Sequence, residues 1–406
     1  MQNRPVLKRI LEIIVSLAAI AVLLVVFWDF WQEIVGIVLG YVVARIGVNI
    51  LFTVQLLHED GNKISTKDFN YDEQTYKRCC KIGDKEITLW FESMTDPTKE
   101  ADYRISDDPN RHFRVDTFIQ SNFTHLIGAH QASYVENKNM IRLDDCEQEG
   151  DGKYLLRTGR TVFYNDLLTN RMMDYKFCGD LTLRALYEPG KYLTPLSESK
   201  LSNHIGINVI IFCGDKILFP CRGGAATQTK NGVTSSIAIG LSETDVVKVL
   251  YGGGNHHPEI KSHDVFERII YDKFKGFTDF GDEELEELKQ AGKIRLHSLG
   301  FCRLIYNGGK PQFYYAMCVD KSLQDKFVLQ KPEWTQQKAI DAVRYYVLAD
   351  GISLKKQDSG QVVMHGAKVR SGRQMVKTAE RSFFVNLWYL KQQPKKDGVP
   401  DWVYAD

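Results

Sequence analysis

The apolar run Ile205-Gly-Ile-Asn-Val-Ile-Ile-Phe212 is the stretch that most strongly defines the fold of the second half of the chain. Such a nearly continuous apolar run is typical of a strand that is buried on both faces of a sheet. Gly214-Asp215 then predicts a tight turn into a strand at residues 216–219. The two segments are therefore expected to form a hairpin inside a covered sheet.

The sequence after this hairpin alternates helix and strand patterns. Asn307-Gly-Gly-Lys310 is a strong hairpin signal between two strand-like runs. Apolar spacing and stop residues predict the other elements. These are a polar loop at 223–232, a strand at 235–239, helices at 259–275 and 282–290, strands at 294–305 and 312–319, and helices at 334–348 and 382–390.

Residues 56–200 read as a separate β-rich module. Short runs rich in Ile, Val, Phe, Tyr and Thr, such as 86–92 and 153–158, are separated by turn clusters such as 107–110 and 149–152. Prolines near residues 189–195 mark its end. No chemical constellation is found in this module, so a structural or regulatory role is expected.

The N-terminal part contains two apolar stretches, residues 10–27 and 34–54. Each is about long enough to cross a hydrocarbon core of ~30 Å as a helix. A cleaved signal peptide is the alternative for the first stretch, but bulky residues, not a small-residue cleavage site, follow it. Two transmembrane helices are therefore predicted within residues 1–55.

The charges around these stretches predict their orientation. Arg4, Lys8 and Arg9 precede the first stretch, whereas the connecting turn carries Asp29 and Glu33. Because basic residues favour the cytoplasmic side, both termini are expected to be cytoplasmic. The expected location is the cell inner membrane, as a multi-pass protein.

Small residues recur every fourth position in the second stretch, at Gly36, Gly40 and Ala44. Such a face lets helices approach closely, either within the hairpin or between copies in a homo-oligomer. Arg45 is either a snorkelling side chain or an interhelical partner for a polar group. These four residues are the predicted membrane-assembly set.

Bulk composition limits the classes of function. The formal net charge is +1 with 25% charged residues, which argues against a general nucleic-acid-binding coat. The eight cysteines are scattered without a CxxC pair, as expected for reduced thiols in the cytosol.

The order of elements resembles a Nudix hydrolase domain. The stretches that carry the resemblance are 203–210, 296–303, 308–316 and 383–388. The resemblance implies a C-terminal Nudix-like α/β/α sandwich at 201–395. Together with the two N-terminal transmembrane helices and the β-rich middle module at 56–200, the expected fold class is α+β.

The catalytic signature of that family is broken in this chain. In the frame that starts at Gly253, Glu259 falls where a glutamate is required. The Arg-Glu pair, however, becomes Glu267-Arg268, and the final pair of glutamates becomes Tyr271-Asp272. Magnesium chemistry needs several carboxylates on one helix face. No metal, no cofactor and no hydrolysis are therefore expected; the alternative is a membrane-tethered Nudix-type hydrolase of a nucleoside diphosphate derivative.

The combination of two spans, a middle module and a Nudix-like domain resembles the two-span Nudix effectors of bacterial CBASS antiphage systems. The resemblance implies that the Nudix-like domain binds a cyclic oligonucleotide made by a partner CD-NTase, not a nucleic acid polymer. It also implies that the spans, as a homo-oligomer in the lipid bilayer, then disrupt the inner membrane and kill the infected cell.

Five residues are candidate ligand contacts. Arg222 precedes a glycine-rich loop and is either a phosphate contact or a surface arginine. Arg303 and Tyr306 lie on a strand whose counterpart lines the family's pocket, so phosphate pairing and base stacking compete with packing at the core edge. Ser236 and His204 are weaker candidates. The adjacent His256 and His257 are not expected to hold zinc.

Overall fold

The structure is a computed structural model, which describes residues 13–18, 20, 69–124, 126, 137–177, 181–223, 231–250, 259–329, 343–369 and 371–405. Contacts divide the chain into two units, Met1–Lys63 and Ile64–Asp406. In the first unit, the described residues 13–18 and 20 are helical. The second unit holds all the strands that the structure describes.

A large mixed sheet forms the centre of the second unit. Its strands follow the order β1-β2-β10-β11-β6-β7-β12, and β8 pairs with β6 off this path. β11 and β6 are parallel neighbours, whereas the other pairs in the sheet are antiparallel. The bounds are β1 Lys77–Ile82, β2 Lys85–Ser93, β6 Gly206–Cys213, β7 Lys216–Arg222, β8 Ile237–Gly240, β10 Ile294–Leu304, β11 Lys310–Val319 and β12 Val343–Ala349.

Both central strands of this sheet are buried along their whole length. Successive side chains of a strand point to opposite faces, so alternate residues of β6 enter different cores. Ile207 and Val209 pack in one core, and Ile210 and Phe212 pack in the other. The predicted strand at 205–212 is confirmed, and burial on both faces explains its continuous apolar sequence.

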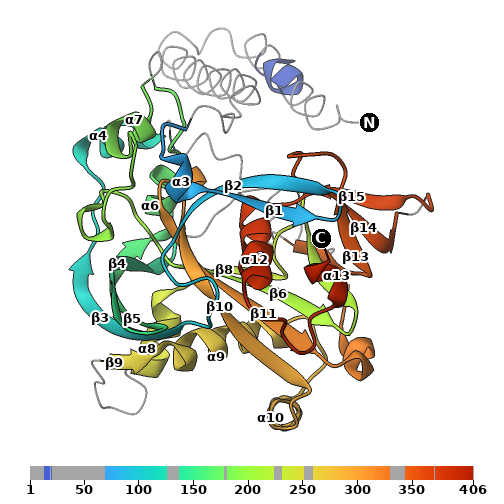
Figure 1. The fold of residues 1–406 in the computed structure, drawn as a ribbon. Coiled ribbons are helices and arrows are strands. Elements are labelled where there is room, and N and C mark those ends of the chain that lie inside the picture. The colour runs from blue at the N-terminus through green and yellow to red at the C-terminus, as the bar shows by residue number, and fades with distance from the viewer. Residues whose placement is uncertain are drawn as a thin grey trace. The chain divides into compact units, whose positions relative to one another are not determined.

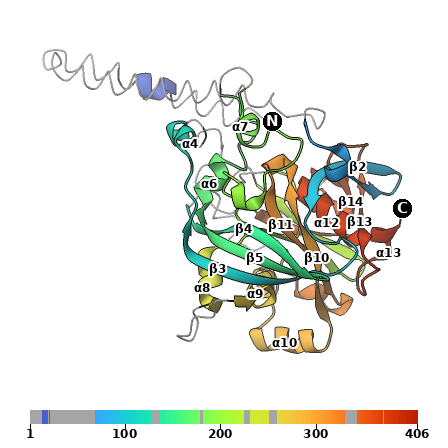
Figure 2. The ribbon, with the colours of Figure 1, turned by 60° about the vertical axis from the view of Figure 1, so that its left-hand side comes forward.

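A four-stranded sheet and helix α9 cover one face of the large sheet (Figure 2). The smaller sheet has the order β4-β5-β3-β9. A turn at Asp151 and Gly152 joins β4 to β5, whereas β3 and β5 are parallel. The bounds are β3 Asp102–His112, β4 Asn139–Gly150, β5 Lys153–Val162, β9 Glu259–Lys261 and α9 Ser262–Lys275.

Helix α12, Arg381–Gln392, lies across the opposite face (Figure 1). A three-stranded sheet of the order β13-β14-β15 shares its core. Its bounds are β13 Gly351–Leu354, β14 Gln361–Lys368 and β15 Gln374–Thr378. Residues 383–390 of α12 are all buried, which confirms the predicted closing helix at 382–390.

Short helices complete the described part of the second unit. The acidic helix α10, Asp282–Gln290, has the predicted bounds. The others are α3 Glu73–Tyr76, α4 Thr117–Ser121, α6 Phe163–Leu168, α7 Leu183–Tyr187, α8 Glu243–Leu250, α13 Asp401–Tyr404, and the 3-10 helices η3 Leu196–Glu198, η4 Ile305–Asn307 and η5 Lys321–Lys326.

Strand pairing links the sequence segments predicted as middle module and Nudix-like domain. β2 pairs with β10 at Phe91–Leu304, and β3 pairs with β9 at Ile105–Ile260. Residues from both segments therefore belong to the same large sheet and to the same four-stranded sheet.

The predicted fold class, an α+β protein with two N-terminal transmembrane helices and an α/β/α sandwich, is wrong. Strand residues outnumber helical residues in the described part of the chain, and no helix there is long and apolar enough to cross a membrane. Of the predicted spans 10–27 and 34–54, the structure describes residues 13–18 and 20; the remainder lies outside the described residues. A crossing helix needs about 20 apolar residues, so the described helical residues do not provide one.

Two further membrane predictions are affected by this correction. The multi-pass location in the cell inner membrane depended on those helices, and the structure contradicts it. The proposed membrane-assembly residues Gly36, Gly40, Ala44 and Arg45 lie outside the described residues.

The predicted helix at 334–348 is also wrong where the structure describes it. Residues 343–349 form strand β12, and residues 334–342 lie outside the described part. Val343, Tyr345 and Val347 favour a strand because β-branched and aromatic side chains fit a pleated surface. Antiparallel pairing with β7 then fixes the strand.

Candidate functional site

Four of the five predicted ligand contacts lie at one end of the large sheet. His204 precedes β6, Arg222 ends β7, Arg303 lies near the end of β10, and Tyr306 lies in η4. The register places these ends together, since Gly206 of β6 pairs with Gln312 of β11 and Arg303 pairs with Pro311. The fifth residue, Ser236, precedes β8 and contacts the middle of the sheet.

Ser236 is a structural residue in this fold. Its hydroxyl group donates a hydrogen bond to the Leu218 carbonyl oxygen at 2.6 Å and accepts one from the Ile211 amide at 2.8 Å. The side chain is 4% exposed. It therefore bridges β6 and β7 where their direct pairing has ended.

Arg303 is buried and pairs inside the protein. Its guanidinium group donates to the carbonyl oxygens of Gly309 at 3.3 Å and Thr194 at 2.7 Å, and to the Glu92 carboxylate at 3.2 Å. The residue is 3% exposed. These contacts support the packing alternative over a phosphate contact.

Arg222 forms part of a more open group at the N-terminus of α12, called here the Arg222 site: Arg222, Thr234, Tyr306, Glu380 and Arg381. Arg222 makes an ion pair with Glu380, whose second carboxylate oxygen accepts a hydrogen bond from Thr234 at 2.8 Å. The guanidinium carbon of Arg381 lies 5.9 Å from the centre of the Tyr306 ring. Nη1 of Arg381 is buried and has no hydrogen-bond partner among the described residues.

His204 belongs to a second group, the Asp166 cluster: Asp166, Arg171, His204 and Lys310. Lys310 Nζ lies 3.0 Å from Asp166 Oδ1 and 2.9 Å from His204 Nε2. Arg171 Nε donates to Asp166 Oδ2 at 2.6 Å, and His204 Nδ1 lies 3.5 Å from Asp166 Oδ1. Asp166 is 0% exposed, so a fully buried carboxylate pairs with both cations.

Burial and mutual contact shift the protonation of this cluster. Burial lowers the pKa of His204 to about 3 and that of Lys310 to about 8. Burial opposes ionisation of Asp166, but the neighbouring bases hold its pKa below the usual range. At neutral pH the cluster therefore contains an aspartate anion, two cations and a neutral histidine.

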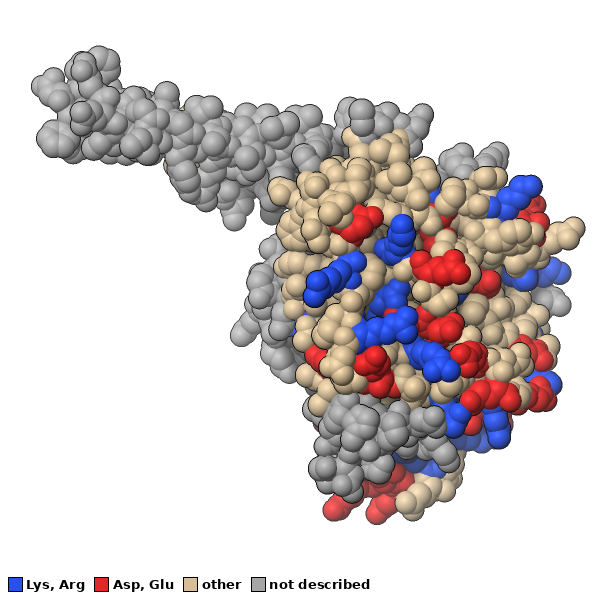
Figure 3. Space-filling view, turned by 90° about the vertical axis from the view of Figure 1, so that its left-hand side faces the viewer, with Lys and Arg blue, Asp and Glu red and all other residues tan. Residues whose placement is uncertain are grey.

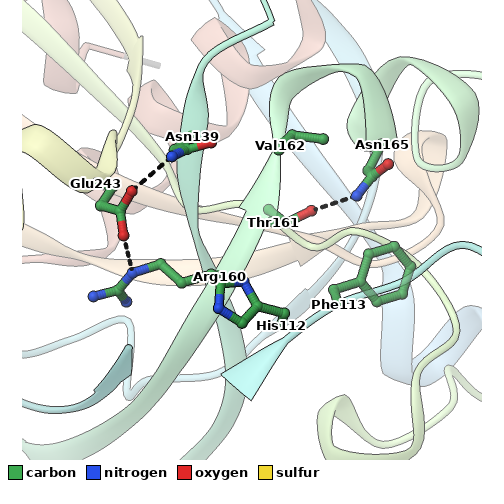
Figure 4. Close-up of a pocket in the computed structure, with 8 residues that line it drawn as sticks. All are labelled: His112, Phe113, Asn139, Arg160, Thr161, Val162, Asn165 and Glu243. Atoms are coloured by element: carbon green, nitrogen blue, oxygen red, sulfur yellow. Dashed lines mark hydrogen bonds and ion pairs between the residues drawn. The ribbon is translucent and has the colours of Figure 1, made fainter. Parts of the chain in front are cut away.

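A small pocket of about 80 Å³ lies beside α6 and the four-stranded sheet (Figure 4). Arg160, 2% exposed, donates to both carboxylate oxygens of Asp107 and to Glu243 at 2.8 Å. Burial opposes ionisation of Glu243, but Arg160 and Asn139 hold its pKa below the usual value. The pocket is lined by His112, Phe113, Asn139, Arg160, Thr161, Val162, Asn165 and Glu243.

The face of the molecule over the four-stranded sheet carries interspersed charges of both signs (Figure 3). Arg157 pairs with Glu147 at 3.0 Å, and Arg104 pairs with Glu149. Because these exposed pairs neutralise one another locally, this face does not present a field of one sign.

The residues of the broken Nudix signature are spread over separate contacts. Arg268 Nη2 donates to the Asp245 carbonyl oxygen at 2.7 Å, and Asp272 lies 3.5 Å from Lys275. Within the described ranges, no group of three His, Cys, Asp or Glu residues is placed to hold a metal ion. The residues around Gly253 and His256 lie outside those ranges.

Sequence reasoning missed most residues of the two groups. Asp166 and Arg171 lie in the segment judged to lack chemistry, and nothing in their spacing shows that they face His204. The sequence indicates Lys310 only as the last residue of a hairpin turn. This position gives no sign that its side chain contacts Asp166 and His204. Nothing in the sequence marks Glu380 as a site residue, because an acidic residue before a helix is common.

No protein-family model and no curated protein matches this chain.

Proposed function

We propose that residues 64–406 bind a cyclic oligonucleotide without hydrolysing it, and that the Arg222 site holds a phosphate group of this ligand. The observation that carries the proposal is the ion pair between Arg222 and Glu380 beside Arg381 and Tyr306. The site thus holds one carboxylate between Arg222 and the Thr234 hydroxyl group, and the next residue, Arg381, lies over the Tyr306 ring.

Glu380 occupies the position that an anionic ligand would take. Carboxylate and phosphate oxygens accept hydrogen bonds from guanidinium groups in the same way. A phosphate could therefore replace the Glu380 carboxylate on Arg222 and Thr234. The Glu380 side chain would then act as an internal competitor that keeps the site paired when no ligand is bound.

The surroundings of Arg222 favour a nucleotide over a simple anion. Tyr306 is a partly exposed aromatic side chain, and its hydroxyl group donates to the Thr88 carbonyl oxygen at 3.3 Å, which fixes the ring. A fixed aromatic ring supports stacking of a base. The N-terminus of the twelve-residue helix α12 adds a partial positive charge for a phosphate.

We propose that the ligand is not hydrolysed because the carboxylates of the described residues do not converge on one point. Phosphoryl chemistry with magnesium requires several oxygen ligands directed at one point. The described residues hold no such group, and the acidic face of α10 pairs with lysines, as in Glu286–Lys289 at 2.8 Å.

The wider role comes from the sequence resemblance to CBASS effectors, without the membrane spans that the structure contradicts. We propose on that basis that the ligand is made by a CD-NTase and that the protein takes part in antiviral defence as a homo-oligomer. An adjacent gene for a cyclic-oligonucleotide synthase would support this role, and its absence from several genomes would count against it.

Substitutions at the Arg222 site provide the direct test. Arg222→Ala should weaken binding of the ligand about 10- to 100-fold, because charge-assisted hydrogen bonds contribute about 1.5–3 kcal/mol. Glu380→Gln should strengthen binding several-fold, because it removes the competing charge. The measurement is calorimetric titration of the full chain with a panel of cyclic di- and trinucleotides, first screened by thermal shift.

Arg157→Ala is the matched control, because Arg157 makes an exposed ion pair with Glu147 on another sheet. It should leave binding unchanged. Equal affinities for the wild type and Arg222→Ala would exclude the proposed site. Magnesium-dependent turnover of a nucleotide by the full chain would instead favour the hydrolase.

A further inference from the structure

The Asp166 cluster joins three parts of the fold that are distant in sequence. Asp166 lies in α6, and Arg171 follows that helix. His204 lies two residues before β6, and Lys310 is the first residue of β11. The cluster therefore connects α6, which follows the four-stranded sheet, to the central strands of the large sheet.

The hydrogen-bond chemistry requires His204 to be neutral. A lysine ammonium group can donate but cannot accept, so the His204 Nε2 atom, 2.9 Å from Lys310 Nζ, must be the unprotonated nitrogen. The proton of the neutral ring then lies on Nδ1, which faces Asp166 Oδ1 at 3.5 Å. In this state each nitrogen faces a group of the complementary kind.

Protonation of Nε2 would place two cations against each other at hydrogen-bond distance. Asp166 already pairs with both Lys310 and Arg171. Glu380, the residue before α12, also acts electrostatically on Lys310. Among the described residues, no further carboxylate contacts His204 to compensate the charge that protonation would add.

The ring has little room to move away. Phe163 lies with its ring centre 6.0 Å from that of His204, and the Arg171 guanidinium lies 5.2 Å from the Phe163 ring. A Cβ atom on Gly240 would lie 3.1 Å from His204 Nε2. A protonated ring must therefore separate α6 from the strands to reach water.

We propose that Asp166, Arg171, His204 and Lys310 form an acid-sensitive latch, which holds α6 against the starts of β6 and β11 and opens when His204 takes up a proton. The open state exposes the histidine and restores its ordinary affinity for protons. Acidification therefore shifts the balance between closed and open states by mass action.

The direction and size of the effect follow from the two states of His204. The pKa is about 3 in the closed state and 6.5 for an ordinary histidine, so the open state binds more protons between these values. The opening equilibrium constant should rise about tenfold for each pH unit below 6.5, or roughly twentyfold between pH 6.0 and pH 4.5.

Amide hydrogen exchange of the full chain tests the latch. The reporters are the amides of Thr169 and Arg171, which donate to Asn165 and Asp166 carbonyl oxygens at 3.0 Å. Their exchange, corrected for the intrinsic rate, should increase relative to the amides of α12 as the pH falls. His204→Gln should remove this increase, because a glutamine oxygen still accepts from Lys310 but does not titrate.

His365→Gln is the matched control, since His365 lies on β14, apart from the cluster. It should behave as the wild type. An unchanged acid response in His204→Gln would overturn the latch. If that variant does not fold, the wild type alone decides: equal acid responses of the α6 and α12 amides would also overturn it.

Discussion

Asp166→Asn should lower the free energy of unfolding by about 3–5 kcal/mol, because removing one partner of a buried ion pair leaves the other charge uncompensated. Asp166 is fully buried and is the carboxylate that faces both Lys310 and Arg171. Asparagine has nearly the same shape, so the loss reports charge rather than a cavity. Urea unfolding of the full chain at pH 7, followed by circular dichroism, measures it.

The pH dependence of this difference is a second signature. The pKa of Asp166 is held below its ordinary value of 3.8, so its charge stabilises the fold above that value. As the pH falls below 3.8 toward the folded-state pKa, the wild type loses this contribution and the two proteins should converge. A difference that stays constant to pH 2 would contradict the assignment.

Glu286→Gln is the matched control, because it removes a similar ion pair from the exposed surface of α10. Glu286 lies 2.8 Å from Lys289, and its side chain is 59% exposed. Exposed pairs contribute about 0–1 kcal/mol. A loss for Asp166→Asn no larger than that of this control would show that the cluster does not depend on the carboxylate.

The elements that sequence predicted correctly are those with a strong local signal. Strand β6 was recognisable because burial on both faces leaves a nearly continuous apolar run. The turn between β10 and β11 was recognisable because Gly308 and Gly309 have φ angles of +58° and +81°, which other residues rarely adopt. Helix α10 was recognisable from its regular leucines.

The elements that were missed are set by distant partners. Strand β12 was predicted as a helix, and pairing with β7, more than 100 residues earlier, decides its conformation. In the same way, residues 259–261 were predicted as the start of a helix but form β9, which pairs with β3 from the first half of the chain. Local propensity is weaker than such tertiary pairing for short segments.

The candidate site also depends on partners that are distant in the sequence. Sequence reasoning selected Arg303 for its charge, but Glu92 and Thr194, which bind it, are far away in the sequence. His204 was selected without its partners, which lie 38 and 106 residues away in the chain. A residue type indicates possible chemistry, whereas partners and burial decide whether a ligand can use it.

Phe313→Ala should lower the free energy of unfolding by about 3–5 kcal/mol, because it removes a large side chain from a fully packed core. Phe313, 0% exposed, stacks on Phe301 at 4.6 Å between ring centres and makes edge contacts with Tyr103 and Phe266, both at 5.0 Å. These rings come from β10, β3 and α9, so one residue of β11 joins the large sheet to both elements that cover it.

Phe123→Ala is the control for this substitution, since Phe123 is 42% exposed and should cost little. If Phe313 joins the two sheets, its replacement should also increase amide exchange in β3, β5 and α9 more than in α12, which packs on the other face. The two faces would then differ in local stability although they share the same central strands. A uniform increase on both faces would mean that the large sheet and its covers unfold as one cooperative unit, and that Phe313 acts on the whole core.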